Sequence, residues 1–392
     1  MKLPIYLDNH ATTMVDPRVV EAMIPYLSEQ YGNAASNHHE FGWKAGAAVE
    51  LARNRVAHLI GARNDEIVFT SGATESINLA FKGIAEGHHS KGEHIVTVAT
   101  EHKAVLDTCK TLEKHGFKVT HLGVDHHGIV SLDDIKRVLT ERTILVSVML
   151  ANNEIGTIAP LAQIGALCRS RDVLFHSDAS QAVGKIPVDV VDLNVDLLSF
   201  TGHKMYGPKG IGALYVRASG PRMNLIPQMD GGGHERGLRS GTLNVPAIVG
   251  FGKAAELADA ELNDDASRTA ALRDMLVEGI TSSLDDVAVN GHPTERLPHN
   301  ANIRFRHVKG DILMMDMKDI AVSSGSACSS ASPEPSHVLT AIGLSREDVL
   351  SSIRFGLGRF TTKEEIGYTI QRVVEVVKSA RTQMLHHQFV NS

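Results

Sequence analysis

Short apolar runs alternate with helical patterns through the first half of the chain, and this alternation restricts the possible folds more than any other feature. The strand-like runs lie at 67–69, 95–98, 143–150, 173–176, 195–198 and 211–216. Helical spacing of apolar residues marks 40–59, 73–82, 102–115 and 161–171. Strands that alternate with helices predict an α/β fold with a doubly wound, mostly parallel sheet. Ligands of such sheets bind at the carboxyl ends of the strands.

The second half of the chain follows a different pattern. It contains a long helical stretch at 246–280, strand-like runs near 301–305 and 353–355, and a helical tail from 363 to about 385. This pattern predicts a smaller α+β domain. We expect the large domain to cover 16–255, and the small domain to combine 1–15 with 256–392.

Composition limits the class of protein. The chain has 392 residues, of which 43% are hydrophobic and 21% charged, as in globular proteins with a large core. A net charge of -6 does not favour nucleic acid. No apolar run has the length of a membrane span and no secretory signal is visible, so we expect a cytoplasmic protein without a membrane partner. The three cysteines form no CxxC pair, so we expect neither disulfides nor a metal site.

One lysine, Lys204, stands in a turn rich in glycine and proline between the apolar runs at 195–198 and 211–216. Partial desolvation at a strand end lowers the pKa of a lysine and makes its amine a nucleophile. Such a lysine is the usual anchor of an aldehyde cofactor such as pyridoxal 5'-phosphate (PLP). A solvated turn lysine is the alternative, and Lys209 fits that description.

Polar side chains follow the other predicted strands. The run Ser71-Gly72-Ala73-Thr74 leads into a helix, where free N–H groups suit a phosphate, although a plain helix cap is the alternative. Asp178 follows an apolar strand and needs a cationic partner, which a protonated pyridine nitrogen would provide, unless it is a helix N-cap. His102 begins a helix, where a structural role is the commoner one. These groups meet at one sheet edge, as a PLP site requires.

The second half adds a nucleophile and a cation. Cys328 lies in a small, polar segment, 323–332, where it should be exposed and able to ionise. Cys109 and Cys168 lie in helical patterns and should be inert. We expect the segment from Ser323 to Pro335 to move, since it offers few apolar anchors. Arg354 could clamp a carboxylate or form a structural ion pair.

These motifs resemble those of the cysteine desulfurases of the IscS/NifS type, which are class V aminotransferase-like enzymes of the fold-type-I PLP group. The resemblance runs from Tyr6-Leu7-Asp8-Asn9 to the Gly358-Arg359-Phe360-Thr361-Thr362 run. It rests on SGATES, TEHKAV, NNEIG, SDASQ, TGHKMYGPKG, GGGHERGLRSGT and SSGSACSS. It implies conversion of L-cysteine to L-alanine, with sulfur passed to an enzyme cysteine as a persulfide. The sulfur would serve iron–sulfur cluster assembly, with tRNA thiolation as a second conceivable destination.

The resemblance also implies a role for each candidate residue. Lys204 holds PLP and removes the α-proton, and Cys328 attacks the substrate sulfur. The remaining implied contacts are as follows: Ala73, Thr74, Thr201 and His203 bind the phosphate, with Thr242 from the other subunit of a homodimer; His102 stacks on the ring and assists proton transfer; Asn153 and Gln181 touch ring substituents; Asp178 pairs with the pyridine nitrogen; and Asn33 and Arg354 hold the cysteine carboxylate.

Two positions depart from the family pattern. Ala34 stands where the family usually has proline, and the C-terminal residues 384–392 do not resemble the scaffold-docking tail of housekeeping members. The expected partners are a second subunit and a sulfur-acceptor protein such as an iron–sulfur scaffold. A selenocysteine lyase or another PLP-dependent aminotransferase-like enzyme is the alternative, but an aminotransferase gives Cys328 no role. A catalytically silent scaffold-binding partner is a further alternative, which the presence of both Lys204 and Cys328 disfavours.

Overall fold

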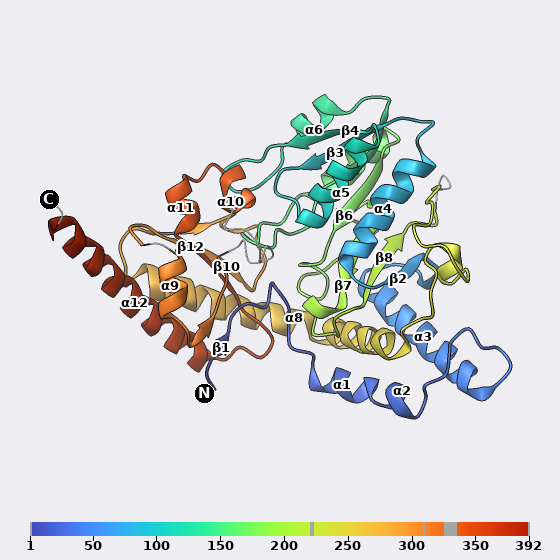
Figure 1. Cartoon of the computed structure of the whole chain (residues 1–392), viewed down its shortest axis with the longest axis horizontal. Coiled ribbons are helices and arrows are strands. Elements are labelled where there is room, and N and C mark those ends of the chain that lie inside the picture. Colours follow the sequence, from blue (N-terminus) through green and yellow to red (C-terminus); the bar gives the residue numbers. More distant parts are fainter. Residues whose placement is uncertain (1, 220–222, 309, 325–334, 391–392) are drawn as a thin grey trace.

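The computed structural model describes residues 2–219, 223–308, 310–324 and 335–390, with side chains to residue 383. Figure 1 shows a larger and a smaller region, with the C-terminus projecting from the smaller one. Within the described residues, no helix combines the length and the apolar character needed to cross a bilayer.

A seven-stranded sheet forms the larger region, in the order β2-β8-β7-β6-β5-β3-β4. The strands are β2 (Ile67–Thr70), β3 (His94–Val98), β4 (Lys118–Leu122), β5 (Thr143–Ser147), β6 (Leu174–Asp178), β7 (Leu197–Thr201) and β8 (Gly212–Val216). Strands β7, β6, β5, β3 and β4 are mutually parallel, whereas β8 runs antiparallel to β2 and β7. The predicted mostly parallel α/β sheet is therefore confirmed, while the edge strand β4 and the direction of β8 are not evident from the apolar pattern.

Helices cover both faces of this sheet, as alternate residues of β2 show. Val68 shares a core with α4 (Ala73–Gly87) and α5 (Lys103–Lys114). Its neighbours Ile67 and Phe69 belong to the core of the opposite face, as expected from the two-residue period of a strand. That face is covered by α3 (Glu40–Leu59), α6 (Leu132–Val138), α7 (Leu161–Ser170) and the first part of α8 (Val245–Thr281).

The N-terminal segment leads into two short helices, α1 (Pro17–Met23) and α2 (Pro25–Ser28). Helix α1 begins after Asp16, whose carboxylate accepts a hydrogen bond from the amide of Arg18 at 3.0 Å, and Pro17 occupies its first turn. The helix predicted at 40–59 is confirmed as α3.

The smaller region has an antiparallel sheet in the order β12-β10-β9 and a parallel pair of β1 with β11. These strands are β1 (Ile5–Tyr6), β9 (Val287–Asn290), β10 (Asn300–Phe305), β11 (Ile320–Ala321) and β12 (Ser352–Gly356). Its helices are α9 (Gly310–Asp316), α10 (His337–Ala341), α11 (Arg346–Leu350) and α12 (Lys363–Val390). Ile303, Phe355 and Val373 are fully buried in its hydrophobic core.

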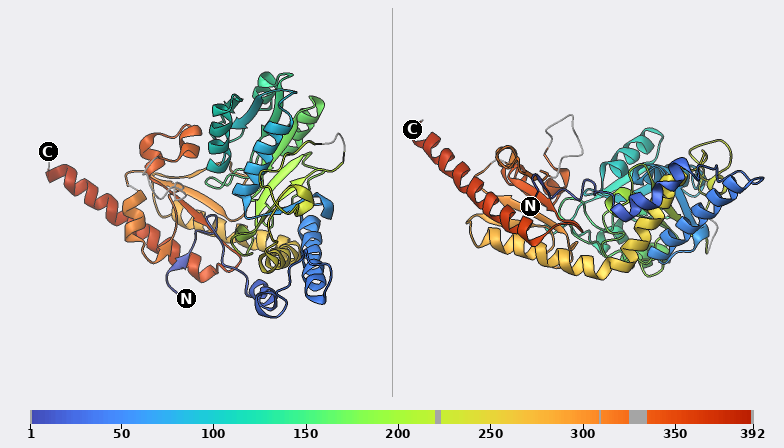
Figure 2. Two further views of the ribbon diagram at one scale, coloured as in Figure 1. Left: turned by 45° about the vertical axis from the view of Figure 1, so that its right-hand side comes forward. Right: turned by 90° about the horizontal axis from the view of Figure 1, so that it is seen from below.

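The 37-residue helix α8 belongs to both regions. Phe251 and Ala255, in its first half, pack in the core of the seven-stranded sheet. Leu272 and Leu276, in its second half, pack in the core of the smaller region. The right-hand view of Figure 2 shows it running along the base of both regions. The two sheets are therefore held relative to each other by one continuous element.

Candidate active site

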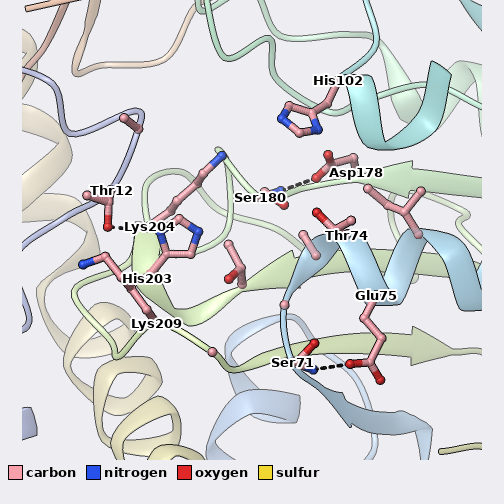
Figure 3. Close-up of a pocket in the computed structure, with 16 residues that line it drawn as sticks. Thr12, Ser71, Thr74, Glu75, His102, Asp178, Ser180, His203, Lys204 and Lys209 are labelled. Carbon is pink, nitrogen blue, oxygen red and sulfur yellow. Dashed lines mark hydrogen bonds between the residues drawn. The ribbon is translucent and has the colours of Figure 1, made fainter. Parts of the chain in front are cut away.

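A pocket of about 450 Å³ lies at the carboxyl ends of β6 and β7, beside the first turn of α4 (Figure 3). Seven of the residues selected from the sequence line it: Ala73, Thr74, His102, Asp178, Thr201, His203 and Lys204. The structure thus brings together side chains that are spread over more than a hundred positions of the chain. This is the edge at which doubly wound sheets bind their ligands.

Lys204 ends the one-turn 3₁₀ helix η2 (Gly202–Lys204), which directly follows β7. The N-terminal segment fixes this turn, because the amide and hydroxyl of Thr13 donate to the carbonyl of His203 at 2.8 and 2.9 Å. The amide of Tyr206, which has a left-handed backbone with φ 65°, donates to Thr13 Oγ1 at 2.9 Å. Lys204 therefore points into the pocket from a fixed backbone (Figure 3).

The first turn of α4 faces the pocket without a side-chain cap. Gly72 is the N-cap residue, and its φ of 153° is one that other residues rarely adopt. Gly212 of β8 approaches it so closely that a Cβ there would lie 2.7 Å from Gly72 Cα. The alternative of a plain side-chain cap is therefore wrong. Exposed amides and the partial positive charge of the helix N-terminus suit a phosphate, and the hydroxyls of Thr74 and Thr201 line the same pocket.

His203 is held neutral at this site. Burial, followed by the positive charges of Lys204 and Lys209, lowers the pKa of His203 to about 4. Its Nδ1 lies 3.1 Å from the hydroxyl oxygen of Thr12, which also lines the pocket. A neutral imidazole can donate one hydrogen bond to an anion without adding a charge.

His102 has both a structural and a pocket-lining role. It is the N-cap of α5, where its Nδ1 accepts a hydrogen bond from the amide of Ala104 at 3.1 Å. Burial lowers the pKa of His102, and the negative charge of Asp178 partly offsets this effect. Since Nδ1 acts as an acceptor, the proton of the neutral ring lies on Nε2. The ring is thereby fixed in both orientation and tautomer.

Asp178 closes β6 and is not a helix N-cap. Its Oδ1 accepts a hydrogen bond from the amide of Ser180 at 2.9 Å, which ties the carboxylate to its own turn. Ser180 Oγ is buried, lines the pocket and has no hydrogen-bond partner among the described residues. A buried hydroxyl without a partner is costly, so this site has polar groups to offer a ligand. A phosphate cradle, a lysine and a carboxylate are the groups that PLP requires, and the residues present fit it.

Asn153 and Gln181 lie near this edge, but neither is among the pocket-lining residues of the described chain. The side-chain amide of Gln181 is bonded to His10. Its Oε1 lies 2.9 Å from His10 Nδ1, and its Nε2 donates to the backbone carbonyl of His10 at 3.1 Å. The carbonyl of Asn153 accepts a hydrogen bond from Arg354 Nη1 at 2.8 Å. Contacts of Asn153 and Gln181 with a cofactor remain a prediction.

Asn33 and Thr242 are exposed and lie outside the pocket-lining set. Asn33 Oδ1 accepts a hydrogen bond from the amide of Ala35 at 2.9 Å, within the loop between α2 and α3. Thr242 follows Arg239, whose Nε donates to Oε1 of Glu75 at 2.7 Å, and Glu75 lines the pocket. The segment with Thr242 is therefore tied to the pocket wall in its own chain, and its role in a second subunit remains a prediction.

Arg354 is buried and already paired. Its Nη2 donates to Asp8 Oδ1 at 2.8 Å, which is the structural ion pair that the sequence left open. Its Nε is buried and has no hydrogen-bond partner among the described residues. The guanidinium therefore has N–H groups beyond those in its bonds to Asp8 and Asn153, and their role with a substrate carboxylate stays a prediction.

Cys328 and most of the segment from Ser323 to Pro335 lie outside the described residues, so its position and its movement remain predictions. Both described cysteines are buried and unpaired. Burial raises the pKa of Cys109 and of Cys168 to about 12, so neither is poised to ionise near neutral pH. Among the described residues, no group of three histidine, cysteine or acidic side chains is arranged to hold a metal ion.

The pocket also contains residues to which the sequence assigned no role. Thr12, Ser180 and Lys209 line it, and Lys209 is exposed as expected for a turn lysine. Ser180 lies two positions after Asp178 in the SDASQ motif, so its proximity to the strand end was the available signal. Thr12 comes from the N-terminal segment, and the sequence pattern does not predict that this segment crosses the sheet edge.

Comparison with known proteins agrees with this geometry. The family model described as Aminotransferase class-V matches residues 5–368. The chain is 59% identical to "Cysteine desulfurase IscS" of Anaeromyxobacter sp. (strain Fw109-5) over 97% of this chain and 94% of that protein. It is 55% identical to "Cysteine desulfurase IscS" of Shewanella sp. (strain MR-4), again over 97% and 94% of the two chains.

Solved structures lead to the same family. A structure titled "NIFS-LIKE PROTEIN" superposes with a TM-score of 0.89 and 39% identity, over 96% of this chain and all of that chain. The NifS-like protein from Rickettsia africae ESF-5 superposes with a TM-score of 0.86 and 30% identity, over 96% of this chain and all of that chain. Sequence, pocket and fold thus agree, and the chain belongs to the cysteine desulfurases of the class-V aminotransferase family.

Proposed function

We propose that this protein is a PLP-dependent cysteine desulfurase, which converts L-cysteine to L-alanine and supplies sulfur for iron–sulfur cluster assembly. The observation that carries the proposal is the pocket in which Lys204 faces Asp178 and His102 beside the uncapped N-terminus of α4. Relatives named cysteine desulfurase IscS share 55–59% identity with this chain, which supports the same activity.

Each pocket residue has a task that its chemistry allows. When bound, PLP supplies an electron sink for negative charge at the substrate α-carbon. Lys204 is the proposed attachment point and the base for the α-proton. The carboxylate of Asp178 stabilises a proton on a pyridine nitrogen. Thr74, Thr201 and the amides of α4 hold the phosphate.

His102 and Arg354 are proposed to orient the reacting molecule. The Nε2–H of His102 is the donor that its cap hydrogen bond leaves available, and it supports the proposed role in proton transfer. Arg354, with Asn33, is proposed to hold the substrate carboxylate, and its unpaired Nε supports this role. Asn153, Gln181 and, from a second subunit, Thr242 complete the proposed cofactor contacts.

The sulfur step is assigned to Cys328. Its thiolate attacks the substrate sulfur, so that an S–S bond forms and the carbon–sulfur bond breaks. The electron pair of the broken bond remains on the substrate carbon, which takes up a proton and leaves as alanine. The enzyme keeps the sulfur as a persulfide, and an acceptor protein such as an iron–sulfur scaffold receives it.

The decisive experiment is incubation of the purified PLP-loaded protein with L-cysteine, followed by measurement of alanine and of protein-bound persulfide. We expect one alanine for each persulfide in a single turnover. Cys328→Ser should bind cysteine without forming persulfide. Formation of pyruvate, or of alanine with no sulfur transfer in wild type, would contradict the proposal. Comparison of L-cysteine with L-selenocysteine kinetics separates it from a selenocysteine lyase, which the relatives do not favour.

A homodimer is proposed as the active form. Helices α1, α2 and α3 and the residues that join them carry several large apolar side chains that are more than 40% exposed, namely Val20, Ile24, Leu27, Tyr31, Phe41, Trp43 and Leu51. Large apolar side chains that are exposed in one part of the chain are typical of protein–protein interfaces, which supports burial against a second copy. Sedimentation of an active monomer with full PLP content would exclude it.

The division into domains and the location of the protein are also proposals. The large domain would cover 16–255, and the small domain would combine 1–15 with 256–392. The position of Leu7 and Leu276 in one core and of Val19 and Ala255 in another supports this division. The unpaired Cys109 and Cys168 agree with the proposed reducing environment of the cytoplasm.

A further inference from the structure

Glu101 is a buried carboxyl group behind the active-site edge. It lies in the turn between β3 and α5, directly before His102, and its side chain is fully buried. Its Oε1 accepts a hydrogen bond from the amide of Met149 at 2.6 Å. The next amide, that of Leu150, donates to the carbonyl of Asp178 at 3.0 Å. Two consecutive amides therefore connect the Glu101 side chain to the backbone of Asp178.

The surroundings of Glu101 do not favour an anion. Its Oε2 is buried without a hydrogen-bond partner among the described residues. His337 on α10 could carry a positive charge, but it does not contact the carboxyl group of Glu101. Its Nε2 lies 2.9 Å from the backbone carbonyl oxygen of Glu101. A buried carboxylate that lacks a cation and leaves one oxygen unsatisfied is strongly disfavoured, whereas the acid form can be accommodated.

The charged and titratable groups around Glu101 act in the same direction. Burial raises the pKa of Glu101 well above its usual value, and the negative charge of Asp178 raises it further. Burial, followed by the nearby carboxyl groups of Glu101 and Glu113, raises the pKa of Cys109 on α5 to about 12, so Cys109 is a neutral thiol near neutral pH. Burial also lowers the pKa values of His102 and His337, which favours their neutral forms.

We propose that Glu101 is a positioning residue that acts through Asp178. Glu101 remains a neutral acid, so that of these two carboxyl groups only Asp178 carries a negative charge. Asp178 lines the pocket and Glu101 does not, so the charge is kept at the group that can meet a protonated ring nitrogen. The importance of this charge for catalysis rests on the proposed function, whereas the unfolding test of the charge does not.

The test is the unfolding of the PLP-free protein as a function of pH, for wild type, Glu101→Gln, Asp178→Asn and the double variant. A carboxyl whose folded-state pKa is raised contributes stability that is fully present below its unfolded-state pKa and lost as pH rises through the folded-state value. Glu101→Gln keeps the neutral form at every pH. Its Tm should therefore match wild type near pH 5 and exceed it increasingly toward about pH 9.

The role of Asp178 is tested by the second background. In the Asp178→Asn protein the gain in Tm from Glu101→Gln should shrink, because the neighbouring charge is gone. Glu154→Gln is the matched control, since Glu154 is a buried acid whose pKa is raised by burial and whose carboxyl accepts a hydrogen bond from Ser336. The change in Tm caused by Glu154→Gln should be the same in the wild-type and the Asp178→Asn backgrounds.

Each outcome decides the proposal. Equal pH dependence of wild type and Glu101→Gln would show that Glu101 is not held as an acid. An unchanged gain in the Asp178→Asn background would show that burial alone is responsible, and the positioning role would be overturned. If Glu101→Gln does not fold, wild type must still lose stability with rising pH more steeply than Asp178→Asn. Absence of desulfurase activity would refute the proposed function and leave these unfolding results unaffected.

Discussion

The seven-stranded and the three-stranded sheets differ in the polar groups that they leave available to a ligand. In the three-stranded sheet polar groups bond to one another, as when Asn290 Nδ2 donates to Asn302 Oδ1 at 2.8 Å. At the pocket edge of the seven-stranded sheet, Ser180 Oγ has no partner among the described residues and α4 has no side-chain cap. Parallel strands end together, so one edge can present several unsatisfied groups to a ligand. The antiparallel sheet contributes Arg354, whose Nη2 is fixed by an ion pair while its Nε has no hydrogen-bond partner among the described residues.

The largest expected effect comes from removing the lysine of the pocket edge. Lys204→Ala should lose covalent cofactor attachment and all turnover, because η2 presents this amine to the pocket from a fixed turn. Visible absorption and borohydride reduction of the purified variant measure the attachment. Lys114→Ala, on the exposed end of α5, is the control. A reducible protein–PLP bond in Lys204→Ala would assign the anchor to another lysine.

Asp178→Asn should have the next largest effect, with the fold retained. A unit charge pair at about 4 Å contributes about 4 kcal/mol at an effective dielectric constant near 20. If this stabilisation acts in the transition state, turnover should fall roughly a thousandfold, since about 1.4 kcal/mol corresponds to a factor of ten. Steady-state kinetics under PLP saturation provide the measurement. Turnover equal to wild type would reduce Asp178 to a turn-forming residue.

Arg354 tests the other side of the comparison. Arg354→Ala leaves Asp8 unpaired and the carbonyl of Asn153 without its donor, so the free energy of unfolding should fall by about 3 kcal/mol. Asp8→Asn combined with Arg354→Ala should cost less than the sum of the single changes. Denaturant unfolding measures both. Strict additivity would mean that the ion pair contributes nothing to stability.

Substrate binding separates the two roles of Arg354. Arg354→Lys keeps a charge but loses the planar donors, so KM for cysteine should rise by more than kcat falls if Nε holds the carboxylate. Asp8→Asn is the matched control, because it weakens the ion pair and leaves the N–H donors of Arg354 in place. Equal KM in wild type and Arg354→Lys would restrict Arg354 to a structural role.

The last expected effect is confined to higher pH and concerns Glu154, which lies between the two sheets. Its carbonyl accepts hydrogen bonds from Asn300 and Asn302 of β10, both at 3.2 Å, and its carboxyl accepts one from Ser336. Burial raises the pKa of Glu154 to about 7. The stability contributed by the acid form is complete below the usual glutamate pKa and is lost as pH rises through about 7.

Glu154→Gln should remove this loss, which a rise in pKa from 4.5 to about 7 puts at roughly 3 kcal/mol. Ser336→Ala should move the transition to higher pH, because the Ser336 hydroxyl favours the ionised form. Unfolding measured between about pH 5 and pH 9 tests both shifts. Identical pH profiles for wild type and Glu154→Gln would contradict the assignment.

The sequence predicts much of the larger region because period and strand-end chemistry are local properties. Helix α3 and the meeting of Thr74, Asp178 and Lys204 at one edge both follow from the sequence. The strand β4 escapes prediction because its five residues Lys118–Leu122 lack a clear apolar pattern. A strand at the edge of a sheet has less need of apolar side chains than a central one.

Partners that depend on long-range contacts could not be predicted. Nothing in the sequence identifies Asp8 as the partner of Arg354, 346 positions away, or Met149 as the donor to Glu101. The sequence also could not predict that Ser180 Oγ has no hydrogen-bond partner among the described residues, since this depends on the side chains that the fold places around it. The candidate residues could be chosen from the sequence, whereas their hydrogen-bonding states required the structure.

Helix α8 makes the two regions depend on each other mechanically. Phe251 in its first half is buried in one core, and Leu276 in its second half is buried in the other. Unfolding of either core therefore removes the packing of half of the same helix. Deleting one residue between them would rotate the second half by about 100° and turn Leu272 and Leu276 away from their core. Heating should therefore produce one calorimetric transition, and the spacing between Lys204 and Arg354 is set by a continuous spine that no flexible linker interrupts.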